Sequence, residues 1–224
     1  NTESIESKMD DLNGTKIGVI DSLLENSAWH SQDKKHPYLL APVDLQAVKA
    51  CGVTFAQSML ERVIEERAKG DPSAAQGIRN DIQKVIGLDL ESIIPGSSEA
   101  EQLKEVLIKK DMWSQYLEVG IGPDAEVFTK AQPMSVMGIG AQIGILEKSE
   151  WNNPEPEITL AVNARGKILG ATLGNDVNLR DIEGRSALLL GKAKDNNASA
   201  AIGPFIRLFD ENFSLDDVRM AELS

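Results

Sequence analysis

The stretch Pro154-Glu-Pro-Glu-Ile-Thr-Leu-Ala-Val162 decides the fold, because it repeats with the two-residue period of a β-strand. Glu155 and Glu157 therefore share one face of the strand. The opposite face is expected to point toward a core and consists of Ile158, Leu160 and Val162. Two neighbouring carboxylates repel each other, so one must take up a proton or a positive group must lie between them. A hard divalent cation with oxygen ligands is the natural partner.

The composition limits the classes of partner. A net charge of -12 argues against binding to nucleic acid or to anionic membrane surfaces. It does not argue against a small anionic substrate, because a bound cation reverses the local sign of charge. The single cysteine, Cys51, excludes an internal disulfide and suits a reducing cytoplasm. We therefore expect a cytoplasmic protein that acts on a small molecule, without nucleic acid or membrane partners.

The first half of the chain is predicted to be a small α/β domain with a helical insertion, spanning residues 1–119. Its opening segment, Lys16–Asp21, is predicted to be a short strand, and Met112–Leu117 a final helical turn. Apolar residues at helical spacing predict three helices, at Thr54–Arg67, Ala74–Gly87 and Glu99–Lys110.

The character of the sequence changes near residue 120, where helical spacing gives way to glycines, prolines and short β-branched runs. Asn163–Lys167 is predicted to be the turn of a hairpin. The predicted strands are Glu126–Lys130, Gln142–Leu146, Glu157–Val162, Ile168–Leu173 and Ser186–Leu190. We therefore expect a second, all-β domain at residues 120–224 and an α+β fold for the chain.

Several short motifs in this second half resemble the fumarylacetoacetate hydrolase superfamily in order and spacing. They are Pro123–Lys130, Pro154-Glu-Pro-Glu157, Gly174-Asn-Asp-Val-Asn-Leu-Arg-Asp-Ile-Glu-Gly184, Ala193-Lys194 and Ile202-Gly-Pro204. Within the superfamily, Trp151–Glu157, Arg180–Gly184 and the upstream segment Leu40–Phe55 are similar to the 2-keto-3-deoxy-sugar-acid dehydratases, including those acting on 2-keto-3-deoxy-D-arabinonate.

The resemblance implies a fold and a site. The fold would be a fumarylacetoacetase-like mixed β-sandwich roll, which we expect to be incomplete because family members continue with further strands after the last motif. The implied metal ligands are Glu155, Glu157 and Asp176, the implied ion is Mg²⁺ with Mn²⁺ as an alternative, and no organic cofactor is implied. The implied catalytic residues are Lys194 and Glu126. A homo-oligomer is also expected.

The implied reaction agrees with the chemistry of such a site. A 2-oxo acid offers a carboxylate and a keto oxygen that together chelate a hard cation, which stabilises the enolate formed when a C3 proton leaves. In a 3-deoxy sugar acid the C4 hydroxyl is β to the ketone, so enolisation prepares its loss. A 2-keto-3-deoxypentonate would thus lose water through a metal-bound enolate and yield 2-oxoglutarate semialdehyde.

Other readings stay open for the same residues. The related small hydrolases use a His–Glu pair to activate water, but Ser58 stands at the histidine position and no histidine follows His36, which favours dehydration. A C–C hydrolase, a decarboxylase or an isomerase of an acylpyruvate-type 2-oxo acid remains an alternative at the same metal site. A catalytically inactive binding relative also remains an alternative.

Two of the residue assignments have alternatives as well. Lys192 is an alternative to Lys194 as the active-site lysine, and Glu126 is alternatively a surface glutamate at the start of a strand.

Overall fold

The computed structural model describes residues 13–52, 63–64, 68, 72–86 and 93–221. The chain groups into two compact units, which we call unit 1 (Asn1–Lys49 and Thr129–Ser224) and unit 2 (Ala50–Phe128). Residues 1–49 thus group with the C-terminal strands rather than with the helical segment that follows them. The division into domains 1–119 and 120–224 stays a prediction, because a grouping by contacts does not test which parts fold alone.

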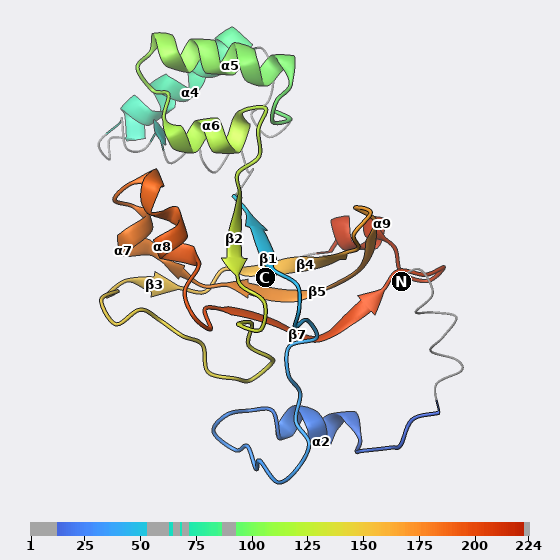
Figure 1. Cartoon of the computed structure of the whole chain (residues 1–224). Coiled ribbons are helices and arrows are strands. Elements are labelled where there is room, and N and C mark those ends of the chain that lie inside the picture. The colour runs from blue at the N-terminus through green and yellow to red at the C-terminus, as the bar shows by residue number, and fades with distance from the viewer. Residues whose placement is uncertain (1–12, 53–62, 65–67, 69–71, 87–92, 222–224) are drawn as a thin grey trace. The chain divides into compact units, whose positions relative to one another are not determined.

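The centre of unit 1 is an antiparallel sheet in the order β4-β5-β7 (Figure 1). Its strands are β4 (Pro156–Val162), β5 (Ile168–Asp176) and β7 (Ala200–Leu208). The backbone N–H of Asn163 donates to the Lys167 carbonyl at 2.9 Å, and Gly166 takes the left-handed conformation that the tight turn needs. The predicted hairpin and its two strands are therefore confirmed.

Short helices and a two-residue ladder flank this sheet, so the expectation of an all-β second half was wrong. The ladder pairs β3 (Asn152–Asn153) with β6 (Asn178–Leu179). The helices are α7 (Arg180–Glu183), the 3₁₀ turn η3 (Ala187–Leu189), α8 (Leu190–Lys194) and α9 (Leu215–Arg219). The strand predicted at Ser186–Leu190 is instead helical, because the Ser186 hydroxyl caps the turn by accepting from the Leu188 N–H.

Three further expectations for unit 1 were wrong. Lys16–Asp21 is irregular up to the start of helix α2 (Ile20–Glu25). Gln142–Leu146 is irregular as well, and its Gly144 N–H donates to the Ala198 carbonyl at 2.8 Å instead of to a sheet partner. On β4, Leu160 and Val162 are exposed at 38% and 54% rather than buried in a core.

Unit 2 is built around helices α4 (Pro72–Ile86), α5 (Ser98–Lys109) and α6 (Gln115–Ile121). Leu103, Leu107 and Leu117 are fully buried in a common apolar cluster. The hydroxyls of Ser97 and Ser114 accept backbone N–H groups at the starts of α5 and α6. The helices predicted at 74–87 and 99–110 are confirmed, whereas most of the one predicted at 54–67 lies outside the described residues.

Two strands, β1 (Val48–Cys51) and β2 (Val127–Ala131), form a two-stranded sheet, and β2 confirms the strand predicted at 126–130. The mixture of helices and sheets agrees with the expected α+β class, whereas the complete β-sandwich roll stays a prediction. Among the described helices, none combines the length and the apolar character that a membrane crossing requires.

Candidate metal centre

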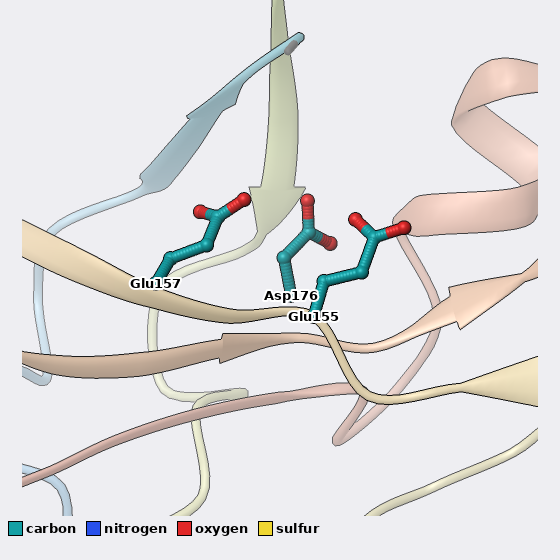
Figure 2. Close-up of side chains that lie close together, drawn as sticks. All are labelled: Glu155, Glu157 and Asp176. Carbon is teal, nitrogen blue, oxygen red and sulfur yellow. The ribbon is translucent and has the colours of Figure 1, made fainter. Parts of the chain in front are cut away.

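Strands β4 and β5, together with Glu155 directly before β4, bring three carboxylates together. The residues paired across the hairpin include Pro156 with Asn175, and the Asp176 N–H donates to the Glu155 carbonyl at 2.9 Å. Figure 2 shows the side chains of Glu155, Glu157 and Asp176 projecting to the same side of the two strands. One oxygen from each lies within 4.8 Å of the others. The structure thus assembles the three residues predicted as ligands, although their role as ligands stays a prediction.

Lys194 completes this cluster from helix α8. Its ammonium pairs with a carboxylate oxygen of Glu155 and lies 3.2 Å from Oδ2 of Asp176. Lys194 is buried, whereas Lys192 is exposed. Ala193 anchors the helix between them, because it packs in an apolar cluster with Leu179 and Ile182. The structure therefore favours Lys194 over Lys192 as the lysine of the site.

A second lysine, Lys130 on β2, was not predicted as part of the site. Its side chain is almost fully buried, and its Nζ lies 3.0 Å from Oδ1 of Asp176. It also donates to the carbonyls of Val177 (2.7 Å) and Lys194, and to the Ser199 hydroxyl at 3.3 Å. These bonds connect the end of β5 to the end of α8. The only signal in the sequence is a lysine inside a short apolar strand, which requires buried oxygen partners if it points inward.

The charges of the cluster are not balanced. The three carboxylates and the two ammonium groups leave one net negative charge when all are ionised. Burial raises the pKa of Glu157, and the nearby charges of Asp176 and Glu155 raise it further. Burial lowers the pKa of Lys130 despite the attraction of Asp176. A proton on Glu157 or an additional cation beside it would remove this excess negative charge.

Lys194 is a fixed positive charge in the cluster when no metal ion is bound. Burial alone would lower the pKa of Lys194, but the charges of Asp176 and Glu155 raise it above its ordinary value. Lys194 is therefore an ammonium group in the metal-free protein. It occupies one oxygen of each of these two carboxylates, and each oxygen retains a further lone pair for another partner.

The donor set fits a hard cation. All three candidate ligands are carboxylates, and oxygen-only sites suit Mg²⁺, Ca²⁺ or Mn²⁺ rather than softer metals. Three protein ligands leave positions of an octahedral ion open for water or for a chelating substrate. Neither histidine joins this cluster in the described structure: His30 is exposed, and His36, also exposed, lies with its Nδ1 3.0 Å from Asp33.

Glu126, the other predicted catalytic residue, belongs to unit 2. It directly precedes β2, is partly buried and accepts the Gly52 N–H through its backbone carbonyl at 2.9 Å. Its carboxylate lies so close to Gly52 that a β-carbon at this glycine would come within 2.5 Å of Oε2. Glu126 is thus held within its own unit, and its part in the chemistry stays a prediction.

Sequence comparison finds two dehydratases that are similar to part of this chain. The chain is 39% identical over 107 residues to the probable 2-keto-3-deoxyxylonate dehydratase of Haloferax volcanii. It is 40% identical over 94 residues to the 2-dehydro-3-deoxy-D-arabinonate dehydratase of Saccharolobus solfataricus. These matches cover 48% and 41% of this chain but only 36% and 32% of the relatives. They confirm the resemblance to 2-keto-3-deoxy-sugar-acid dehydratases. No family model matches the chain.

Solved structures agree on the fold. The apo form of 2-keto-3-deoxy-D-arabinonate dehydratase superposes with a TM-score of 0.58 at 22% identity. The same enzyme complexed with magnesium and 2,5-dioxopentanoate superposes with a TM-score of 0.53 at 21% identity. Both alignments cover 92% of this chain and 55% of the dehydratase chain, so the present chain corresponds to about half of that structure.

Proposed function

We propose that this chain, a relative of the 2-keto-3-deoxy-sugar-acid dehydratases, is a Mg²⁺-dependent hydro-lyase that removes water from a 2-keto-3-deoxypentonate. The observation that carries the proposal is the convergence of Glu155, Glu157 and Asp176 within 4.8 Å, with buried Lys194 paired to two of them. Support comes from the identity to two dehydratases and from the magnesium complex of a protein with the same fold. The 2,5-dioxopentanoate in that complex is 2-oxoglutarate semialdehyde, the product expected from a pentonate.

The three carboxylates would hold the ion, with Mn²⁺ as an alternative to Mg²⁺. When bound, the cation supplies Lewis acidity, which polarises the keto group of the substrate and makes its C3 protons more acidic. The net negative charge of the apo cluster is then reversed, so an anionic substrate is attracted to an otherwise acidic protein.

Lys194 supplies a second, fixed positive charge. Its ammonium is buried against Glu155 and Asp176, so it stands beside the ligands without the freedom of a surface lysine. We assign it the stabilisation of negative charge that develops on the substrate as the C3 proton leaves, because preorganised charges act strongly in a buried site. Lys130 holds the ends of β5 and α8 in place.

The reaction needs proton transfers as well as charge stabilisation. Loss of a C3 proton and the C4 hydroxide, as water, creates a double bond between C3 and C4. Removal of a proton from C5 and return of one to C3 moves the double bond to C4 and C5, and the resulting enol becomes the aldehyde. We assign these proton transfers to a carboxylate outside the ligand set, Glu126, as the family resemblance implies.

The first test is turnover. The chain is incubated with 2-keto-3-deoxypentonates of each C4 configuration, with Mg²⁺ or with EDTA, and semialdehyde formation is followed by NMR. We expect Mg²⁺-dependent formation from one configuration. Turnover of an acylpyruvate alone would replace the dehydratase by the hydrolase, decarboxylase or isomerase alternative. No turnover and no stabilisation by Mg²⁺ would identify an inactive binding relative.

Substitutions then separate binding from chemistry. Glu155→Gln and Asp176→Asn should abolish metal binding and turnover together, because each removes a charged ligand. Lys194→Ala should retain the metal but lower kcat by about 100-fold or more, the loss typical of removing one group that stabilises developing charge. Lys192→Ala is the matched control, since this lysine is exposed on the same helix. A near-normal kcat in Lys194→Ala would refute the role of Lys194.

A further inference from the structure

An asparagine and a glutamate outside the three-carboxylate cluster form a chain of hydrogen bonds to one of its members. Asn178, on β6, is completely buried, and its Nδ2 donates to Oε1 of Glu155 at 3.0 Å. The same Nδ2 donates to Oε2 of Glu183, at the end of α7, at 2.6 Å. A single buried amide group therefore joins a predicted metal ligand to a second carboxylate farther out.

This arrangement fixes both the amide and the ligand. Carboxylates only accept hydrogen bonds, so Glu155 and Glu183 together force the NH₂ end of Asn178 toward them. The amide oxygen Oδ1 then points elsewhere and has no protein partner within the described structure. Glu155 is consequently held at both oxygens, by Asn178 at Oε1 and by Lys194 at Oε2.

The orientation of the Asn178 amide satisfies its nitrogen but not its oxygen. A buried polar atom without a partner is unfavourable, and Oδ1 of Asn178 has no hydrogen-bond partner among the described residues. The opposite orientation of the amide would place Oδ1 against two carboxylates and would remove both hydrogen bonds. The outer carboxylate Glu183 thus selects the orientation in which the ligand Glu155 is held.

We propose that Asn178 and Glu183 are positioning residues that set the Glu155 carboxylate for cation binding, with Glu183 acting through the amide of Asn178. The proposal rests on the metal centre proposed above. Residues that orient metal ligands by hydrogen bonds typically change metal affinity by about 10- to 100-fold when removed. The effect of Glu183 should depend on its ability to accept a hydrogen bond from Asn178, not on its negative charge.

The test compares Mn²⁺ affinity, measured by the electron paramagnetic resonance signal of free Mn²⁺, in four variants of the full chain. Asn178→Ala should weaken binding about 10-fold or more. Glu183→Ala should weaken it several-fold in the same direction, and Glu183→Gln should stay near the wild type because its amide oxygen still accepts from Asn178. Asn212→Ala, at an exposed position of unit 1, is the matched control and should bind as the wild type does.

If Asn178→Ala does not fold, the variants Glu183→Ala and Glu183→Gln still test the proposal. Glu183 is only partly buried, so we expect both variants to fold. Equal losses in Glu183→Gln and Glu183→Ala would show an effect of charge alone and overturn the proposal, as would wild-type affinity in Glu183→Ala. Wild-type protein that binds no Mn²⁺ would refute the metal centre and this inference together. If it binds Mn²⁺ but never forms semialdehyde, only the dehydratase function fails.

Discussion

At the scale of single residues, the buried lysine Lys130 carries the clearest consequence for stability. An ammonium group inside a protein is unfavourable unless oxygen atoms replace its water, and Lys130 has Asp176 and two backbone carbonyls around it. The same lysine balances Asp176, which is itself buried. Each member of the pair therefore depends on the other.

We predict that Lys130→Met lowers the free energy of unfolding by about 3–5 kcal/mol, because it leaves the buried Asp176 charge with one partner fewer. Urea unfolding of the metal-free protein measures the change. Lys192→Met should change the free energy by less than about 0.5 kcal/mol, as is usual for an exposed position. A Lys130→Met protein as stable as the wild type would show that the ion pair with Asp176 is not important to the fold.

Glu157 gives a prediction with a sign that depends on pH. Its pKa is raised in the folded, metal-free protein by burial first and then by Asp176 and Glu155. Between the pKa of Glu157 in the unfolded state and its higher pKa in the folded state, the folded protein binds more protons than the unfolded protein. The free energy of unfolding therefore decreases as the pH rises through this range. Glu157→Gln removes this pH-dependent contribution to stability.

In EDTA at about pH 8, Glu157→Gln should consequently be more stable than the wild type, and the difference should shrink toward about pH 5. Excess Mg²⁺ should reverse the order, because only the wild type retains all three candidate ligands. Urea unfolding at both pH values, with and without Mg²⁺, measures the effect. A variant less stable than the wild type in EDTA at the higher pH would contradict the account of Glu157.

The residues of the site differ in how readily the sequence reveals them. Glu155 and Glu157 follow from strand alternation, and Asp176 and Lys194 from the family motifs. Lys130 and Asn178 were missed because alternation assigns a face within one strand but does not say which other elements lie against it. A lysine is also rarely buried, so its sequence position alone favours the surface.

At the scale of elements, the β4–β5 hairpin was predictable and β7 was not. The Asn163–Lys167 turn and the flanking alternation define the hairpin locally. Strand β7 contains Gly203-Pro204, which argues against a strand, yet proline is tolerated here because β7 is at the edge of the sheet. Ser186–Leu190 was misread because three leucines suit a buried strand as well as a short helix.

The hairpin itself can be tested at Gly174, which pairs with Glu157 across the two strands. A β-carbon at this position would lie 2.2 Å from Oγ1 of Thr159, so Gly174→Ala should force β4 and β5 apart beside the site. We expect the free energy of unfolding to fall by about 1–3 kcal/mol. Adding Thr159→Ala removes the clash and should restore most of the lost free energy of unfolding. Urea unfolding of the wild type, both single variants and the double variant measures the coupling energy between the two positions.

Gly77→Ala is the matched control for this series. Gly77 lies in helix α4 with open space around the position of a β-carbon, so alanine should stabilise the protein by about 0.5–1 kcal/mol through helix propensity. If Gly174→Ala behaves like Gly77→Ala, the close packing of β4 against β5 is not as described.

At the scale of the whole molecule, the sequence revealed a change of character but not the grouping of its parts. The helices of unit 2 end near residue 120, where the loss of helical spacing was predicted, but the short helices α7, α8 and α9 follow later in the chain. The grouping of residues 1–49 with unit 1 arises from contacts between segments far apart in sequence, such as the bond from the Trp29 N–H to the Gly140 carbonyl at 2.9 Å. Local patterns contain no information about such pairs.

This grouping leads to a prediction for the response to metal. The candidate ligands all belong to unit 1, and the apolar cluster around Leu103 lies entirely in unit 2. We predict that the two units open separately, as cooperative units within one protein often do. Mg²⁺ at about 100 times its Kd should therefore slow hydrogen exchange about 100-fold for amides of β5 that exchange only when unit 1 unfolds. Amides of α5 should change little.

The Trp29 amide then distinguishes the two divisions of the chain. If residues 1–49 belong to unit 1, Mg²⁺ should slow exchange at Trp29 along with β5, because its partner Gly140 lies in the same unit. If the chain is instead divided near residue 120, Trp29 should follow α5. The Glu155→Gln variant is the control, since without this carboxylate Mg²⁺ should protect neither segment. Equal protection of β5 and α5 in the wild type would mean that the units unfold as one.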